Sequence, residues 1–307
     1  MIIRNRETQT ENVRNQTVNG LSVKGFLITS SGTPTSANID FEQCVVKIVL
    51  NRNGTQDIIL QDDLKKLGLA SNVDMLAQYA FSTTPITVGS DLGALICFSI
   101  PFGGHINLKN DDYLFVEVTN LKDLFTSNAQ STSYIETKLI KSVGYEEFIP
   151  QISSKVIQAN ESTRKYDLGD NVKRAVILNY DKTDFTDNVV QNITISSDRY
   201  NENLTFPDLV LSKINRFGKQ LLPSASNSDI STGLQEDQSF VLMDFHQHFN
   251  GVELDIKFSP AQVVQGNNVI VYWTYRTDAG ILQKAQNLQA KHVQKAIDAI
   301  PAGNNKK

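Results

Sequence analysis

The most restrictive feature of the sequence is that one succession of strand-like segments occurs twice. VVKIVLN at 45–51 resembles RAVILN at 174–179, at a shift of 128 residues. Further on, ICFSIPFGGHINLKNDDYLFVEV, from Ile96, aligns without gaps to VELDIKFSPAQVVQGNNVIVYWT, from Val252, at a shift of 156. Few residues are identical, but both copies keep the order strand, loop, strand. The two shifts place about 28 additional residues within the second copy, and the pattern predicts a duplicated β domain.

The composition of the repeated segments indicates the kind of domain. β-Branched and aromatic residues dominate them, and turn residues recur about every 8–12 positions in the second half, which is typical of antiparallel sandwiches. Each copy holds about eight short strands in roughly 110–130 residues, the size of a jelly roll with two four-stranded sheets face to face. We therefore predict an all-β chain of two tandem eight-stranded jelly rolls, at 21–150 and 171–278.

Three segments fall outside the two predicted jelly rolls. Residues 1–20 are polar and predict an N-terminal arm that needs a partner surface to become ordered. Over 151–170 polarity rises and the strand pattern fades, which predicts a linker. Residues 279–307 predict a C-terminal amphipathic helix and tail, because apolar residues fall on one helical face. We expect that face to pack on the chain's own barrel or a neighbour; alternatively, lysines of the segment face anionic lipid: Lys284, Lys291, Lys295, Lys306 and Lys307.

Composition and charge exclude several classes of protein. Apolar residues make up 40% of the chain and charged residues 20%, and the formal net charge is −4, with no basic stripe for nucleic acid. The N-terminus has no apolar core of a signal peptide, and no run approaches the roughly 18–20 apolar residues that span a bilayer. We expect synthesis in a cytoplasm, with Cys44 and Cys97 as buried free thiols.

One stretch suggests a metal site. In DFHQHFNGVELDIKF, residues 244–258, His246 and His248 are two residues apart on a predicted strand and Glu253 follows. Cupins, which are also jelly rolls, use such a set for a divalent transition metal. Their second motif is missing: the nearest text, from Pro101 to His105, is one residue too short and precedes the histidines. We favour an exposed or interfacial strand end, and assign no catalytic, cofactor-binding or metal residues.

The remaining candidate sites have simpler structural interpretations. Trp273 lies beside Tyr272 and Tyr275 on a strand and is expected in the sandwich core and its rim, although a ligand-stacking platform remains an alternative. The paired carboxylates of 62–66 are interpreted as a helix start and those of 110–113 as a turn. Motifs for phosphate loops, nucleophile elbows and paired Cys-x-x-Cys sites are absent from the sequence.

The tandem organisation resembles the double jelly-roll major capsid proteins of tailless, internal-membrane-containing icosahedral bacteriophages, of the corticovirus and finnlakevirus kinds. The resemblance covers residues 21–278 and rests on length, repeat order and strand pairs such as ALICFSIPF with DDYLFVEVTNL. It implies a non-enzymatic major capsid protein without cofactors that homotrimerises into pseudo-hexameric capsomers, which form an icosahedral shell around a membrane in the virion.

The implied partners are the protein itself, neighbouring capsomers, minor capsid or penton proteins and the internal membrane, but not nucleic acid. Alternatives are a minor capsid or spike protein, a bicupin-like metalloenzyme using His246, His248 and Glu253, and a carbohydrate-binding sandwich module.

Overall fold

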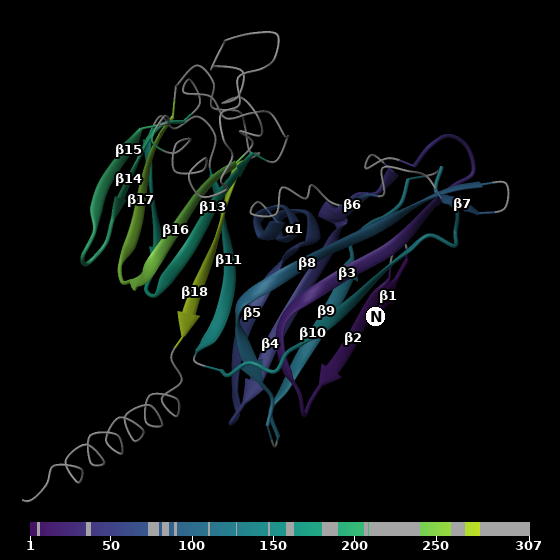
Figure 1. Cartoon of the computed structure of the whole chain (residues 1–307), viewed down its shortest axis with the longest axis horizontal. Coiled ribbons are helices and arrows are strands. Elements are labelled where there is room, and N and C mark those ends of the chain that lie inside the picture. Colours follow the sequence, from purple (N-terminus) through teal and green to yellow (C-terminus); the bar gives the residue numbers. More distant parts are fainter. Residues whose placement is uncertain are drawn as a thin grey trace, which may run out of the picture.

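Antiparallel strands form nearly all the regular structure in the described part of the chain (Figure 1). The computed structural model describes residues 1–4, 7–34, 38–72, 80–81, 86–88, 91–109, 111–126, 128–146, 148–157, 163–179, 190–205, 208, 240–258 and 268–276. Within them, the strands divide into two sandwiches that follow one another along the sequence and lie side by side in space. The predicted C-terminal helix and tail, 279–307, lie outside the described residues.

The second sandwich has the strand order of a jelly roll. One layer has the order β16-β13-β18-β11 and the other β12-β17-β14-β15. In each layer, strands distant in sequence are neighbours, which is the signature of a rolled-up pair of Greek keys. Its strands are β11 (Ile149–Ile157), β12 (Thr163–Gly169), β13 (Val172–Asn179), β14 (Val190–Ser196), β15 (Asn201–Thr205), β16 (Phe240–Phe249), β17 (Val252–Phe258) and β18 (Asn268–Arg276).

The first sandwich is built on the same plan with additions. One layer has the order β5-β4-β9-β2 and the other β1-β10-β3-β8-β6, with β7 also pairing β8. A 3-10 turn, η2 (Phe41–Gln43), precedes β4, and a helix, α1 (Leu64–Asn72), follows β5. Its strands are β1 (Ile2–Ile3), β2 (Thr8–Val13), β3 (Thr17–Thr29), β4 (Cys44–Arg52), β5 (Thr55–Asp63), β6 (Ala80–Phe81), β7 (Ile86–Val88), β8 (Asp91–Asn107), β9 (Tyr113–Asn120) and β10 (Tyr134–Lys141). The described residues of the first roll therefore form ten strands rather than the eight expected.

The strands of the sequence repeat occupy matching places in the two rolls. β9 lies between β2 and β4, and β18 lies between β11 and β13; β8 pairs β3, as β17 pairs β12. The shift of 156 also preserves the side-chain face, because Ile100 and its counterpart Ile256 both point into their own roll. The duplicated order predicted from the sequence is thus present in the fold.

In the early part of the repeat, β4 and β13 superpose with a shift that differs by one residue from the shift in the sequence alignment. Leu50 pairs Leu114 in the first roll, and Ile177 pairs Ile270 in the second, so the structural shift is 127 rather than 128. A one-residue slip exchanges the two faces of a strand. The sequence could not fix this register, because β13 carries apolar side chains on both faces: Ala175 and Ile177 on one, Val176 and Leu178 on the other.

Two predicted non-strand segments contribute strands instead. Residues 1–20, expected as an arm, contain β1, β2 and the start of β3, and Ile3 is fully buried in the core. Their polarity reflects the sheet edge that β2 forms beside β9, where one face meets solvent. Most of 151–170, expected as a linker, belongs to β11 and β12, and Ile152 and Tyr166 are buried.

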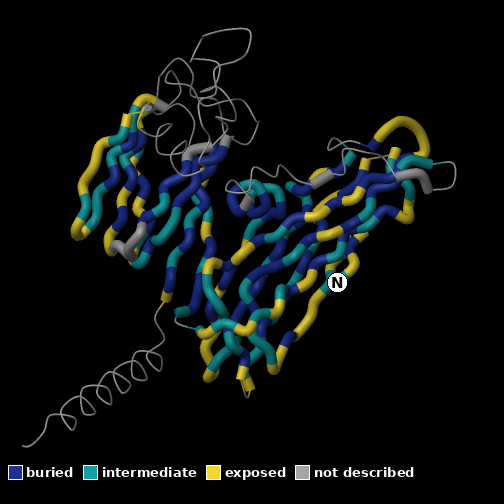
Figure 2. Tube along the Cα trace, in the orientation of Figure 1, coloured by how far each residue is buried: buried dark blue, intermediate teal, exposed yellow. Residues whose placement is uncertain are grey.

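Hydrophobic packing joins the two rolls. One core cluster fills the second roll, whereas a larger cluster fills the first roll and continues onto the outward side of β13 and β18. That side contributes Val176, Val271 and Trp273 to the first roll's core. Figure 2 shows buried residues running through the strands of both halves, and exposed residues in the turns and along edge strands such as β2 and β15. Strands β13 and β18 are therefore buried on both faces over Ala175–Leu178 and Val269–Val271, as their apolar side chains require.

Candidate functional site: the junction of the two rolls

The two rolls meet at a junction formed by β5, β11 and helix α1. β5 and β11 meet in parallel, with Leu60 opposite Ile152, and this contact joins two four-stranded layers into one eight-stranded sheet. Helix α1 contacts β13 and β18 of the second roll and β8 of the first, so it lies between the rolls (Figure 1). The junction thus combines a shared sheet with a packed helix.

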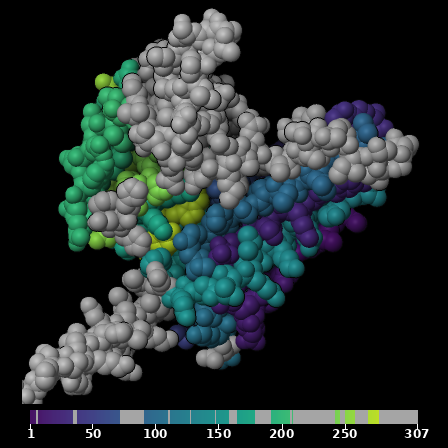
Figure 3. All heavy atoms as spheres, viewed as in Figure 1, coloured from purple at the N-terminus to yellow at the C-terminus, as the bar shows by residue number. Residues whose placement is uncertain are grey.

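Trp273 and Tyr275 reach from β18 to the β8 strand of the first roll. Trp273 is 3% exposed, and its indole Nε1 donates to the carbonyl of Pro101 at 3.4 Å. The Tyr275 hydroxyl donates to the carbonyl of Gly103 at 3.1 Å. Gly103 has φ +82°, and a Cβ there would lie 2.6 Å from that hydroxyl, so glycine allows the approach. In Figure 3 the yellow atoms of β18 lie against the blue atoms of β8.

Burial controls the protonation of Tyr275. Desolvation, together with the charge of Asp244 and against the opposing effect of Arg174, raises the pKa of its phenol to about 12. The phenol therefore stays neutral and remains a hydrogen-bond donor at ordinary pH. Phe148 packs edge-on against the ring at 4.8 Å between centroids, and this fixes the ring at the end of the junction.

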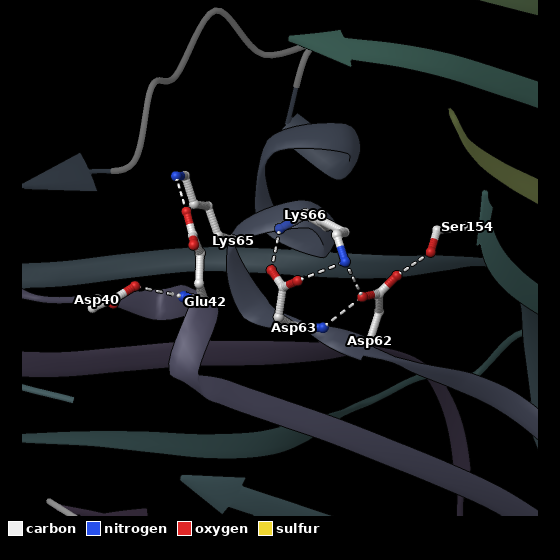
Figure 4. A network of polar contacts seen from close by, with 7 residues as sticks. All are labelled: Asp40, Glu42, Asp62, Asp63, Lys65, Lys66 and Ser154. Atoms are coloured by element: carbon white, nitrogen blue, oxygen red, sulfur yellow. Dashed lines mark hydrogen bonds and ion pairs between the residues drawn. The ribbon is translucent and has the colours of Figure 1, made fainter. Parts of the chain in front are cut away.

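A polar network holds α1 at the junction (Figure 4). The Asp63 carboxylate accepts from the backbone N–H of Lys66 at 2.8 Å, which makes it the cap of the helix start, as the sequence predicted for 62–66. The Lys66 ammonium lies 2.9 Å from both Asp62 and Asp63. Asp62 also accepts from the hydroxyl of Ser154 on β11. One carboxylate therefore links the first roll's helix to the second roll's first strand.

The charges of this network support one another. Burial alone would lower the pKa of Lys66, but hydrogen bonds with Asp63 and Asp62 raise it above its ordinary value. At the other side of the helix, Lys65 pairs with Glu42, whose backbone N–H donates to Asp40 at 3.1 Å (Figure 4). The Lys66 ammonium stays charged and keeps its two carboxylate partners, and together the ion pairs fix η2, α1 and β5 relative to one another.

A second charged cluster holds the connector between the rolls, the segment that leads from β10 to β11 and contains Ser142, Gly144 and Glu146. Arg52, at the end of β4, donates from Nε to Asp112 at 3.0 Å and from both terminal nitrogens to Glu146, with one contact at 3.0 Å. Glu146 also accepts from the backbone N–H of Asn107 at 2.5 Å. The side chains of Arg52 and Glu146 are only 10% and 8% exposed. The connector is thus attached to the base of the first roll by a bidentate ion pair.

His105 reinforces the same connector. Its Nδ1 lies 2.7 Å from the hydroxyl of Ser142, which also accepts from the backbone N–H of Gly144 at 3.2 Å. The ring lies so close to Gly144 that a Cβ there would collide with it. His105, the last residue of the stretch that partly resembles the second cupin motif, therefore packs on the connector. The Arg52 cluster was not predicted from the sequence, because its members are up to 94 residues apart and match no motif.

The two strands that carry the suspected metal ligands belong to different sheets. His246 and His248 lie on β16 in the eight-stranded sheet, whereas Glu253 lies on β17 in the four-stranded sheet, where it pairs with Asp167 and Ser196. The side chains of the two histidines lie outside the described residues. Gly251, between the two strands, has φ +60° and forms the predicted turn. In the described part of the chain, no three His, Cys, Asp or Glu side chains gather as a metal site.

The other candidate residues divide between core and surface. The burial of Trp273 contradicts a ligand-stacking platform and agrees with the expected core position. Cys44 is buried as expected, but Cys97 is exposed, so the prediction of two buried thiols was half wrong. Cys97 lies on β8 between the buried Ile96 and Phe98, and the alternation of the strand turns it outward.

Sequence comparisons find no relative. The chain matches no family model, and no curated protein matches it. Solved structures do match. In the atomic structure of Sulfolobus Turreted Icosahedral Virus, a chain with 10% identity aligns with a TM-score of 0.56 over 95% of this chain and 97% of that one. The crystal structure of the STIV MCP aligns with a TM-score of 0.54 and 11% identity, over 89% and 94%.

These alignments cover both rolls and the junction between them. The chain has the double jelly-roll fold. The major capsid protein P2 of bacteriophage PM2 also matches, with a TM-score of 0.48 and 12% identity over 91% of this chain and 99% of that one. The predicted fold class is confirmed, and the fold is the one found in viral capsid proteins. Among the described helices, none is long and apolar enough to cross a bilayer.

Proposed function

We propose that the chain is the major capsid protein of an icosahedral virus with an internal membrane. In this role it forms homotrimers, each a pseudo-hexameric capsomer, and the capsomers tile the shell. Its partners are neighbouring capsomers, minor capsid or penton proteins and the internal membrane, and its place is the virion after synthesis in the host cytoplasm. It acts by assembly and not by catalysis.

The observation that supports this proposal is that several kinds of contact hold the two rolls in one relative position. A shell tile must keep the relative position of its two rolls while its outer faces contact neighbours. The shared core, the continuous eight-stranded sheet, the buried Arg52–Glu146 ion pair and the partly buried α1 network meet this requirement. The likeness to the viral structures extends over 95% of the chain, so it includes the arrangement of both rolls.

The oligomeric state of the purified protein tests the proposal. We expect size-exclusion chromatography with light scattering to give a particle of about three chains, each of 34.2 kDa. Self-association follows from the fold of a shell tile, whose faces are built for copies of itself. A monomer at all concentrations would contradict the proposal. Stoichiometric bound metal that is lost in His246→Ala would instead support the metalloenzyme alternative.

A further inference from the structure

The connector between the rolls presents two apolar side chains to solvent. Among the described residues, Val143 and Tyr145 are the most exposed large apolar residues, Val143 completely and Tyr145 to 89%. The residues that alternate with them, Ser142, Gly144 and Glu146, are partly buried. We call the outward side of the connector, formed by Val143 and Tyr145, the connector patch. Neighbouring apolar side chains held in water are typical of a contact surface.

The inward-facing residues of the connector hold this patch in place. Glu146 accepts from both terminal nitrogens of Arg52. Ser142 lies 2.7 Å from Nδ1 of His105 and also accepts from a backbone N–H of the connector. The patch therefore cannot turn inward without breaking contacts at both ends of the connector, and its burial requires a further segment.

The chain leaves the described region next to the connector patch. Arg276, the last described residue, pairs with Ile149 at the start of β11, and its guanidinium binds Asp57 on β5 (Figure 1). Four residues separate Ile149 from Tyr145 of the patch, which is at most about 14 Å of chain. The segment 277–307 therefore begins within short reach of the patch.

The first two turns of the helix predicted for this segment carry a matching apolar face. Ile281, Ala285 and Leu288 recur at helical spacing. Residues four apart advance about 6 Å along a helix. The two side chains of the connector patch, two residues apart on an extended segment, are separated by about 7 Å. The linking residues 277–280 can extend to about 14 Å, which is enough to bring this face to the patch.

We propose that the apolar face of residues 281–288 docks on the connector patch of its own chain. The short linker favours the same chain over a second copy, because two sites joined by a short flexible linker meet at a millimolar effective concentration. The docked segment joins the end of β18 to the segment that leads into β11, and so covers the lower side of the junction. This contact does not depend on the shell role proposed above.

Thiol labelling of the full-length chain tests the docking. Val143→Cys places a thiol of similar size in the connector patch and keeps Tyr145. The native Cys97, which is exposed on β8, is the reference in the same molecule. Cys44 stays silent because it is buried, and desolvation together with the charge of Asp63 raises its pKa to about 12. Circular dichroism and thermal unfolding check that each variant folds.

We expect the thiol of Val143→Cys to react about tenfold faster, relative to the reference thiol, when Ile281→Lys and Leu288→Lys are added, because the two ammonium groups prevent docking. Gln283→Lys with Asn287→Lys is the matched control. It adds the same charge to the opposite side of the predicted helix and should leave the rate unchanged. Equal rates in all three proteins, or protection that appears only with anionic lipid vesicles, would overturn the proposal.

Disulfide trapping identifies the chain that supplies the segment. In a Cys97→Ser background, Val143→Cys with Leu288→Cys should form a disulfide within one chain under mild oxidation, detected by non-reducing electrophoresis and intact mass. Val143→Cys with Asn287→Cys is the control, since position 287 is turned about 100° away on the helix and should remain largely reduced. Equal trapping of the two pairs would indicate chance encounters, and a disulfide-linked dimer would indicate a second copy. Either result contradicts docking within the chain.

Discussion

Trp273→Ala should lower the free energy of unfolding by about 3–5 kcal/mol, because it removes a large aromatic side chain from a packed core. Trp273 is 3% exposed and belongs to the core that joins the two rolls. The substitution also removes the hydrogen bond to Pro101 and leaves the Arg174 guanidinium, now 5.0 Å from the ring centroid, without its aromatic face. Chemical denaturation followed by far-ultraviolet circular dichroism measures the loss.

The control for this prediction is Trp273→Phe. It keeps an aromatic ring in the junction and removes the indole N–H, so we expect a smaller loss than for alanine. Circular dichroism is the suitable probe because Trp273 is the single tryptophan, and both variants lose its fluorescence. A loss below about 1 kcal/mol for Trp273→Ala would show that the junction does not depend on this side chain.

Glu146→Ala should lower the free energy of unfolding by about 3–5 kcal/mol, because it leaves the buried Arg52 guanidinium without its bidentate partner. The carboxylate accepts from both terminal nitrogens of Arg52, and it raises the pKa of that guanidinium above its ordinary value. Burial opposes this effect, so the cation depends on its carboxylates. Removing one of them also detaches the connector between the rolls, and the denaturation midpoint measures the result.

The matched control is Glu136→Ala on the outer face of β10. Glu136 pairs with Lys24 at 3.0 Å, but the two side chains are 27% and 58% exposed. An exposed pair contributes less than about 1 kcal/mol, so this variant should unfold almost as the wild type does. Equal losses in the two variants would contradict a special role for the Arg52 cluster.

The parts of the fold that the sequence predicted correctly are those with one apolar face. In β8 and β17, alternation places Ile100 and Ile256 inward, so the repeat and the side-chain face could both be predicted. The turn at Gly251 and the helix start at Asp63 also follow from local chemistry. These features depend on neighbours within a few residues, which a single sequence contains.

The junction could not be predicted because its signals come from residues distant in the chain. β13 and β18 have apolar residues on both faces. The sequence pattern predicts a strand at each position, but it does not show that the second face is buried against another roll. Residues 151–157 appeared too polar for a strand because the stretch contains Ser153, Ser154 and Lys155. Ser153 is exposed, whereas Ser154 is partly buried and bonds to Asp62. The Arg52 cluster, similarly, joins the end of β4, the loop between β8 and β9 and the segment between β10 and β11.

The protein content of purified virus particles tests the central claim most directly. If the chain is the main shell subunit, it should be the most abundant protein in those particles, because an icosahedral shell uses its tile in many copies. Quantitative electrophoresis or mass spectrometry of the particles provides the measurement. A dominant band of 34.2 kDa is the result we predict. Absence of the chain from the particles, or its presence as a rare component, would contradict a major capsid role.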